Sequence, residues 1–437
     1  MSVAKARAKL RTRPSSTSAK RSSPGKGRSP KAASAAAKSN VKTSATKASS
    51  QPRKAKSVHS AMTSKPTEAT ASTGAVSREA GGTELVPTKK TRDSLPARGV
   101  TLVTGATGFL GAHLIRALAA SGTAGPIRAM QTGAAPTWLR DPALGVELVR
   151  GSVTSAEDLA AALVGVERVY HLAGFVSHKS EDAHRMYQVH VDGTRLLCRA
   201  ASDANVRRIV MASTSGTVAV SKRPDAALDE DSPPPLDLIG RWPYYTSKLY
   251  QEEAARRACG DRVELVTVNP SLLLGPGDDR LSSTRLVLQY LGREIPMSPS
   301  GGVNFVDARD VAAALPLAME RGRAGQRYLL GGENWSFDEF FGRLERMTKV
   351  PGPLIKGRGK IPWYASLAQS MLYKQLGRTS PIEPAAVDMA GHYWYFDSRK
   401  AHEELGFVTR DATDTLLETV RYVREHFLGT DVLAKTG

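Results

Sequence analysis

The sequence predicts an α/β fold in which helices flank a doubly wound parallel sheet, and three observations support this prediction. From Val100 onward, short apolar runs rich in β-branched residues alternate with segments of helical periodicity, which is typical of β-α-β units. The first of these runs leads directly into a glycine-rich turn. No period of about 20 to 50 residues recurs, which excludes a solenoid.

Six runs are predicted to be strands. They are Val100 to Thr104, Ile127 to Met130, Val146 to Val149, Val166 to Leu172, Arg208 to Ser213 and Val263 to Asn269. Right-handed crossovers between parallel strands bring their carboxyl ends to one edge of the sheet, where ligands bind. We therefore expect the functional side chains to follow the strands directly.

The first 96 residues have a composition that excludes a hydrophobic core. They contain no Phe, Trp or Tyr, and their 21 basic and 4 acidic side chains give a charge of +17. Only +2 of the chain's formal +19 therefore belongs to residues 97–437. We expect a disordered, solvated tail. Two other interpretations stay open. Ser-Pro elements at Ser23 and Ser29 resemble linker-histone tails that contact nucleic acid, and the acid-poor composition also fits an organelle transit peptide.

The remaining 341 residues suffice for one large α/β domain with an appended lobe. We expect the main domain over residues 97–280 and a smaller lobe, mainly for substrate binding, over residues 281–437, with some elements returning to the sheet. Only two cysteines, Cys198 and Cys259, occur, which favours a reducing compartment without disulfides. No apolar run reaches the ~20 residues that span a bilayer, and no secretory signal is evident, so we expect a soluble cytoplasmic protein.

The turn after the first strand carries the glycines of Gly105-Ala106-Thr107-Gly108-Phe109-Leu110-Gly111. Gly105 permits a tight turn, Gly108 lets the backbone approach a pyrophosphate, and Gly111 lets the following helix lie close to the strand. Free amides at the start of that helix bind the anion. The pattern predicts that residues 97–280 bind NAD or NADP, with cofactor contacts from Gly105, Thr107, Gly108, Phe109, Leu110 and Gly111.

Tyr244 and Lys248 lie four residues apart, leading into a predicted helix, so both side chains project from one face. A phenol with an ordinary pKa of about 10 is a weak base at neutral pH. A neighbouring ammonium group and an oxidised nicotinamide favour the phenolate and lower that pKa. Ser215, after the fifth strand, is placed to hold the same substrate oxygen, with Ser213 as the alternative hydroxyl. We predict that Ser215, Tyr244 and Lys248 are the catalytic residues.

At these residues the chain resembles the extended short-chain dehydrogenase/reductase family over about residues 98–428. The glycine turn matches its cofactor turn, and Ser215, Tyr244 and Lys248 match its catalytic triad. The sequence is most similar to the NAD-dependent epimerase/dehydratase branch, which includes dihydroflavonol reductases, 3β-hydroxysteroid dehydrogenases and hopanoid-associated sugar epimerases. This likeness extends to Arg327–Asn334 and Tyr395–Ala401. It implies a Rossmann-type sheet.

The resemblance also implies cofactor contacts beyond the glycine turn. The turn Gly151-Ser152-Val153 stands where the family usually has an acidic residue near the adenine, and Asn269-Pro270-Ser271 matches the segment that touches the nicotinamide. Small apolar residues after the fourth strand suit a flat cofactor ring. The expected contacts are Ser152, Val153, Leu172, Ala173, Tyr244, Lys248, Pro270 and Ser271.

Two departures from the family pattern leave details open. His190 stands where the family has an asparagine ahead of Gly193-Thr194. The second strand is followed only by Gln131-Thr132-Gly133, without an acid for a ribose diol or an arginine for a 2′-phosphate. NAD and NADP therefore both remain candidates, with Arg128 or Arg150 available to a phosphate.

Several other conspicuous residues are interpreted as structural. His178, His184 and His190 recur every six residues, a spacing that does not stack ligands on one helical face, so we expect no metal site. Asp229–Asp231 precede three prolines and are expected in a solvated loop. An amphipathic strip within residues 363–372 is expected to pack on the core rather than enter a membrane. Its members are Trp363, Tyr364, Leu367, Ala368, Met371 and Leu372.

The predicted function is hydride transfer between nicotinamide and a secondary alcohol or ketone. A sugar-nucleotide epimerase that keeps its NAD tightly bound is the alternative. A different class, a non-catalytic dinucleotide sensor with a nucleic-acid-binding tail, is disfavoured by the complete triad. Apolar residues near the predicted substrate segments favour a sterol-like or flavonoid-like ligand over a sugar: Phe175, Val176, Trp242, Phe305 and Trp363. The sequence is also compatible with a homodimer.

Overall fold

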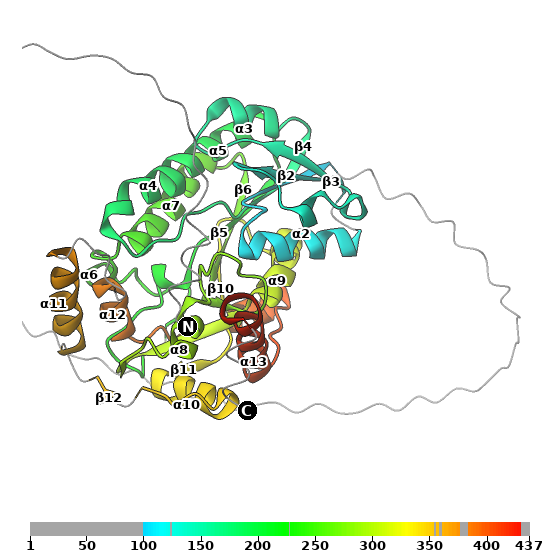
Figure 1. Cartoon of the computed structure of the whole chain (residues 1–437). Coiled ribbons are helices and arrows are strands. Elements are labelled where there is room, and N and C mark those ends of the chain that lie inside the picture. Colours follow the sequence, from blue (N-terminus) through cyan, green and yellow to red (C-terminus); the bar gives the residue numbers. More distant parts are fainter. Residues whose placement is uncertain are drawn as a thin grey trace, which may run out of the picture. The chain divides into compact units, whose positions relative to one another are not determined.

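The computed structural model describes residues 99–429, except for 123–124, 227, 354, 358–360 and 376–382. The predictions made for the tail, residues 1–96, lie outside these described residues. Within them, the predicted fold class is confirmed. A seven-stranded parallel sheet has the strand order β10-β6-β5-β4-β1-β2-β3 and is flanked by helices (Figure 1).

All six predicted strands belong to the main sheet, and a seventh joins them. The strands are β1 (Val100–Thr104), β2 (Ile127–Gln131), β3 (Val146–Arg150), β4 (Val166–His171), β5 (Arg208–Ala212), β6 (Glu264–Pro270) and β10 (Arg327–Leu330). The strand β10 pairs with β6 although more than fifty residues separate them in the sequence. It therefore completes the sheet from beyond residue 280.

Helices cover both faces of this sheet. On one face α2 (Phe109–Ser121) packs against α9 (Ala308–Arg321), and on the other lie α3 (Ala156–Ala162), α5 (Gly193–Asp203) and α7 (Pro243–Cys259) (Figure 1). The strand β5 shows why both faces are apolar. Val210 joins the core under α2 and α9, whereas Ile209 and Met211 join the opposite core, and all three are fully buried. Period-two alternation in a doubly covered sheet requires this pattern.

Residues beyond the sixth strand also build a core of their own. Phe305, Phe340 and Tyr290 lie at its centre, among α8 (Arg285–Leu291), α10 (Phe337–Thr348) and α13 (Ala412–Val423). Small sheets are formed by β7 (Leu272–Leu274), β9 (Gly302–Asp307) and β11 (Asn334–Ser336), and by β8 (Met297–Ser298) with β12 (Ile355–Lys356). The domain boundary at residue 280 stays a prediction.

Shorter helical segments complete the described chain. They are α4 (Ala183–Tyr187), α6 (Leu236–Ile239), α11 (Ile361–Gln375), α12 (Pro384–Ala390), the 3-10 turns Thr137–Arg140, Pro142–Leu144, Ser180–Asp182 and Ser215–Thr217 (η5), and the π-helical turns Gln188–Asp192 (η4), Ala401–Leu405 and Arg424–Leu428. Cys198 and Cys259 are buried free thiols. Among the described residues, no helix has the length and apolarity needed to cross a bilayer.

Two structural predictions are wrong in part. Asp229 and Asp231 are exposed, as predicted. Glu230 is not solvated: it is buried, and its Oε1 accepts a hydrogen bond of 2.8 Å from the backbone N–H of Leu329. Leu329 belongs to the edge strand β10, whose outward N–H groups need partners. The apolar strip on α11 does not pack on the core either. Met371 and Leu372 are exposed, and α11 packs mainly against α12.

Candidate active site

The glycine turn between β1 and α2 is closely packed and leaves the start of α2 open. Gly105 has a φ of +72°, and a Cβ there would lie 2.6 Å from the carbonyl carbon of Leu172 after β4. No side chain of the described residues caps α2, and its first turn contains no acidic residue. The amides of that turn are therefore available to an anion.

Three buried polar atoms along the carboxyl edge of the sheet have no hydrogen-bond partner among the described residues. They are Gln131 Oε1 at the end of β2, Asn269 Oδ1 near the end of β6 and Ser271 Oγ just beyond it. Buried polar atoms without partners are uncommon and call for a ligand or ordered water. Together with the open start of α2, they fit an elongated, hydroxyl-rich group such as a pyridine dinucleotide.

Lys248 is buried at the base of this edge in a polar network. Its Nζ donates hydrogen bonds of 2.7 Å to the carbonyl oxygen of Ala212 at the end of β5 and to Gln251 Oε1. Gln251 Nε2 in turn donates to Thr194 Oγ1 on α5, at 2.9 Å. Burial lowers the pKa of Lys248 to about 8, and the negative charge of Glu252 opposes that shift. The ammonium group is thus held in place and titrates close to neutral pH.

Tyr244 lies one turn before Lys248 at the start of α7, where Pro243 begins the helix. Its ring meets the His190 ring edge-to-face, with centroids 5.9 Å apart. Burial raises the pKa of Tyr244 to about 12, so the phenol is neutral without further positive charge. Tyr244 can therefore act as a base only where positive charge close by stabilises its phenolate. Lys248 and a bound cation would supply that charge.

The two candidate serines differ in their surroundings. Ser213 Oγ donates a hydrogen bond to the buried carboxylate of Glu252, which also accepts from Thr217 and Asn269. Ser215 is buried in η5, the turn that packs against α7. The hydroxyl of Ser213 is therefore committed to a structural bond, and the structure describes no such carboxylate at Ser215.

His190 connects α7 to the loop that follows β4. Its Nε2 accepts a hydrogen bond of 3.0 Å from the backbone N–H of Phe175, which places the proton on Nδ1. Nδ1 then donates to Ser247 Oγ at 2.9 Å, and that hydroxyl donates to the carbonyl oxygen of Tyr244 at 2.7 Å. Burial lowers the pKa of His190 to about 2, so the ring stays neutral.

A second buried histidine joins the ends of β1 and β4. His171 Nδ1 lies 2.8 Å from Thr104 Oγ1, and its Nε2 lies 2.8 Å from Thr194 Oγ1. Burial lowers the pKa of His171 to about 3. Thr104 Oγ1 also accepts the N–H of Ala173 at 3.3 Å, so the network reaches a predicted cofactor contact. The sequence analysis did not identify His171, Thr194 or Gln251, because no local motif links them.

The remaining predicted contacts follow the strand ends as expected, and their cofactor roles stay predictions. The Ser152 amide and hydroxyl bind Asp158 and Thr154 within the turn after β3. Arg128 is already engaged by Glu147 and two backbone carbonyl oxygens, so it is not available to a 2′-phosphate. A guanidinium nitrogen of Arg280, Nη2, donates a hydrogen bond of 3.4 Å to Thr107 Oγ1. Arg280 was not identified from the sequence.

A small cavity of about 10 Å³, which is too small to enclose a substrate, lies beside the Tyr244 phenol. Its lining is mainly aromatic and apolar, and it contains no Lys, Arg, Asp or Glu: Ser177, His178, Trp242, Pro243, Tyr244, Tyr245, Ala385 and Met389. Trp242 was predicted to lie near the substrate and is present here. Phe305 is not, because it is buried in the core of the C-terminal lobe. The side chain of Trp363 lies outside the described residues.

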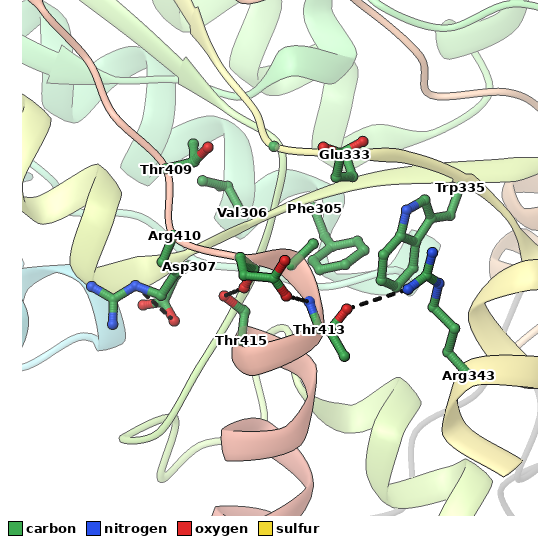
Figure 2. Close-up of a pocket in the computed structure, with 13 residues that line it drawn as sticks. Phe305, Val306, Asp307, Glu333, Trp335, Arg343, Thr409, Arg410, Thr413 and Thr415 are labelled. Carbon is green, nitrogen blue, oxygen red and sulfur yellow. Dashed lines mark hydrogen bonds and ion pairs between the residues drawn. The ribbon is translucent and has the colours of Figure 1, made fainter. Parts of the chain in front are cut away.

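A larger cavity lies elsewhere and contains none of the predicted catalytic or cofactor-binding residues, although Phe305 lines it. It measures about 560 Å³ and is lined by segments around β9, β11 and the start of α13. Figure 2 shows Arg343 beside Trp335 and Arg410 beside Asp307. These arginines are paired with acidic or aromatic groups of the protein.

The three evenly spaced histidines lie in different surroundings. His178 lines the small cavity, His184 is exposed on α4, and His190 is buried. In the described part of the chain, no three His, Cys, Asp or Glu side chains gather as metal ligands do.

An open helix start and a phenol with a buried lysine, all at the carboxyl edge of a parallel sheet, are typical of dinucleotide-dependent enzymes of hydride chemistry. Comparison with known proteins agrees. The model of the NAD-dependent epimerase/dehydratase family matches residues 101–331, more than half of the chain. The chain belongs to this family.

Individual relatives cover the same region. The chain is 31% identical to a Synechocystis protein named as a dihydroflavonol 4-reductase candidate, over 74% of this chain and 94% of that protein. It is 32% identical to sterol demethylase protein B of Methylococcus capsulatus, over 74% and 98%. A nucleoside-diphosphate-sugar epimerase from Pseudomonas aeruginosa superposes with a TM-score of 0.58 at 26% identity, covering 75% of this chain and 97% of that one. The predictions of an extended short-chain dehydrogenase/reductase and of an NAD(P)-dependent enzyme are confirmed.

Proposed function

We propose that this enzyme is a reductase or dehydrogenase that interconverts a secondary alcohol and a ketone, with Tyr244, Lys248 and Ser215 as its catalytic residues. The observation that supports this most directly is the buried Lys248 ammonium one helical turn from the Tyr244 phenol. The nicotinamide of the cofactor supplies or accepts the hydride when it is bound.

The protein's own residues move one proton in this scheme. In reduction, the Tyr244 hydroxyl donates its proton to the substrate oxygen as hydride reaches the carbonyl carbon. In oxidation, the phenolate takes that proton back as hydride leaves the same carbon. Lys248 stabilises the phenolate by its positive charge, and Ser215 holds the substrate oxygen. The hydroxyl of Ser213 already donates a hydrogen bond to Glu252, which supports Ser215 as the residue that holds the substrate oxygen.

The surface beside Tyr244, around a hollow of only about 10 Å³, favours a weakly polar substrate by the side chains it presents. It is lined by Trp242, Tyr245 and Met389 and contains no cationic side chain to hold a diphosphate. This fits the names of the dihydroflavonol and sterol relatives better than a nucleotide sugar. We therefore propose a sterol-like or flavonoid-like ligand.

The test is a Tyr244→Phe variant assayed with NADH and NADPH against ketones and alcohols of the sterol and flavanone classes. We expect the variant to lose turnover and to bind the nucleotide as the unchanged protein does. Turnover near the unchanged rate would refute the catalytic assignment.

Epimerisation is the second candidate, because the family and a solved relative include epimerases. In that case hydride returns to the opposite face of the same carbon. The cofactor would then co-purify and would not be consumed, whereas a reductase changes nicotinamide absorbance in proportion to product.

Three further proposals concern the whole chain. The +17 charge of residues 1–96 would bind nucleic acid phosphates nonspecifically, and unchanged salt-sensitive gel shifts after truncation to Arg98 would overturn this. A cytoplasmic location is tested by fractionation. A homodimer is tested by light scattering.

A further inference from the structure

Arg280 lies beside the glycine turn although it belongs to a distant loop. Its Nη2 donates a hydrogen bond of 3.4 Å to Thr107 Oγ1, across 173 positions of the sequence. Thr107 directly precedes Gly108, the N-cap residue of α2. The contact therefore joins the loop that follows β7 to the turn that follows β1, at the point where the free amides of α2 begin.

The loop that presents Arg280 is held in shape by its own acidic residues. Asp278 is buried at 1% exposure, and its carboxylate accepts hydrogen bonds from three backbone N–H groups and two hydroxyls of residues 282–284. Asp279 accepts a hydrogen bond from the hydroxyl of Tyr422 on α13. Both carboxylates next to Arg280 in the sequence are thus engaged by other groups.

A histidine of α2 fixes the same loop against that helix. His113 Nε2 donates a hydrogen bond of 3.0 Å to the carbonyl oxygen of Pro276. The His113 ring meets the Phe109 ring edge-to-face, with centroids 5.5 Å apart. Gly277 follows with a φ of +101°, a conformation that favours glycine. The loop is therefore anchored to the first turns of α2, and Arg280 is positioned by structure that does not depend on its own side chain.

The position of this cation is electrostatically unfavourable in the absence of an anion. The start of a helix carries the positive end of the helix dipole. In the described part of the chain, no side chain caps α2, its first turn contains no acidic residue, and Arg280 forms no ion pair. Two positive groups therefore lie next to each other. An anion that contacts both removes the repulsion, and a guanidinium suits phosphate because it can donate two parallel hydrogen bonds.

We propose that Arg280 binds the diphosphate of the dinucleotide cofactor, together with the backbone amides at the start of α2. The glycine turn supplies neutral donors, and the loop after β7 adds the charged one. The cofactor is then held by two segments that are far apart in the sequence. This proposal rests on the glycine turn as the cofactor-binding turn, and it does not depend on the catalytic roles of Tyr244, Lys248 and Ser215.

The test measures nucleotide binding to the full chain, without turnover. NADH is titrated by its fluorescence, and ADP and adenosine are used to displace it, because ADP keeps a diphosphate that adenosine lacks. We expect Arg280→Ala to raise the Kd of NADH and of ADP at least about tenfold and that of adenosine less than about twofold, since only the diphosphate loses a charged hydrogen bond. Arg280→Lys keeps the charge without the planar fork and should lie in between.

A second measurement separates this role from a structural one. Without nucleotide, Arg280→Ala should not lower the temperature of unfolding, because a cation at the positive end of a helix contributes no stability. Arg262→Ala, an exposed arginine just before β6, is the matched control and should change neither Kd nor unfolding.

Three results would overturn the proposal. The first is a Kd of NADH that is the same in Arg280→Ala and in the unchanged protein. The second is equal weakening of ADP and adenosine, or a lowered unfolding temperature, which would show that Arg280 only maintains the loop. The third is an unchanged protein that binds neither NADH nor ADP, which would also remove the cofactor assignment of the glycine turn.

Discussion

His190 Nδ1 and Ser247 Oγ are joined by a hydrogen bond of 2.9 Å, which ties the loop after β4 to α7, the helix that carries Tyr244 and Lys248. The same ring accepts the backbone N–H of Phe175. The imidazole of His190 therefore bridges two elements of the chain.

Both buried histidines make stability depend on pH. In the unfolded chain their pKa is ordinary, about 6.5, whereas burial lowers it to about 3 for His171 and about 2 for His190. Below about pH 6.5 the unfolded state thus binds protons at these two histidines that the folded state does not bind. Their contribution to stability is complete above about pH 6.5 and is lost as the pH falls toward the folded values.

We expect His190→Asn to flatten this acid dependence. Urea unfolding between about pH 6 and pH 4.5 should show a slope shallower by up to one proton, or about 1.4 kcal/mol per pH unit. His184→Asn, at an exposed position on α4, is the control and should keep the original slope. Equal slopes for His190→Asn and the unchanged protein would contradict the buried, neutral state of His190.

We expect kcat/KM to depend on the protonation of Lys248. Its pKa of about 8 means that the ammonium is lost as the pH rises through that value, so kcat/KM for reduction should fall on the alkaline side. Lys248→Arg keeps a permanent cation, and we expect a lower rate without this alkaline limb. A pH profile with the same limb in the variant would show that another group titrates.

Substitution distinguishes the two serines. Ser215→Ala should lower kcat by about 100-fold or more, because it removes a hydrogen bond to the reacting oxygen. Ser213→Ala should reduce the free energy of unfolding by about 1–3 kcal/mol through the lost partner of Glu252, and leave kcat within a few-fold. The reverse pattern would make Ser213 the catalytic hydroxyl. Nucleotide affinity, measured by fluorescence, should be unchanged in both.

The orphaned acceptor on Gln131 predicts the choice of cofactor. An amide oxygen accepts from a ribose hydroxyl but does not attract a phosphate, so NADH should bind more tightly than NADPH. Gln131→Arg should move the ratio of the two Kd values toward NADPH by about tenfold. Arg128→Ala should leave the ratio alone, since that guanidinium is bound to Glu147. Tighter NADPH binding by the unchanged protein would contradict this prediction.

Local sequence patterns predicted the parts of the site that depend on neighbouring residues. The strand, glycines and helix around Gly105 lie within about twenty residues, and Tyr244 and Lys248 share one helical face. The network of Lys248, Gln251, Thr194 and His171 joins three separate elements, α7, α5 and β4. No periodicity or motif connects such residues, so only the folded chain shows that they meet.

Periodicity also leaves the direction of a face undetermined. The strip on α11 was recognised as apolar, but the sequence does not show which side of a helix meets the protein. In the folded chain α11 packs mainly against α12, and Met371 and Leu372 are exposed. Glu230 was misjudged for a similar reason, because its partner on β10 is almost a hundred residues away.

The most direct test of the central claim is the consumption of NADH or NADPH by the unchanged protein and by Tyr244→Phe with one responsive ketone, together with the nucleotide Kd of each. The account predicts turnover only in the unchanged protein and equal Kd values in both. Turnover that survives the loss of the phenol hydroxyl, or an unchanged protein that binds neither nucleotide, would contradict it.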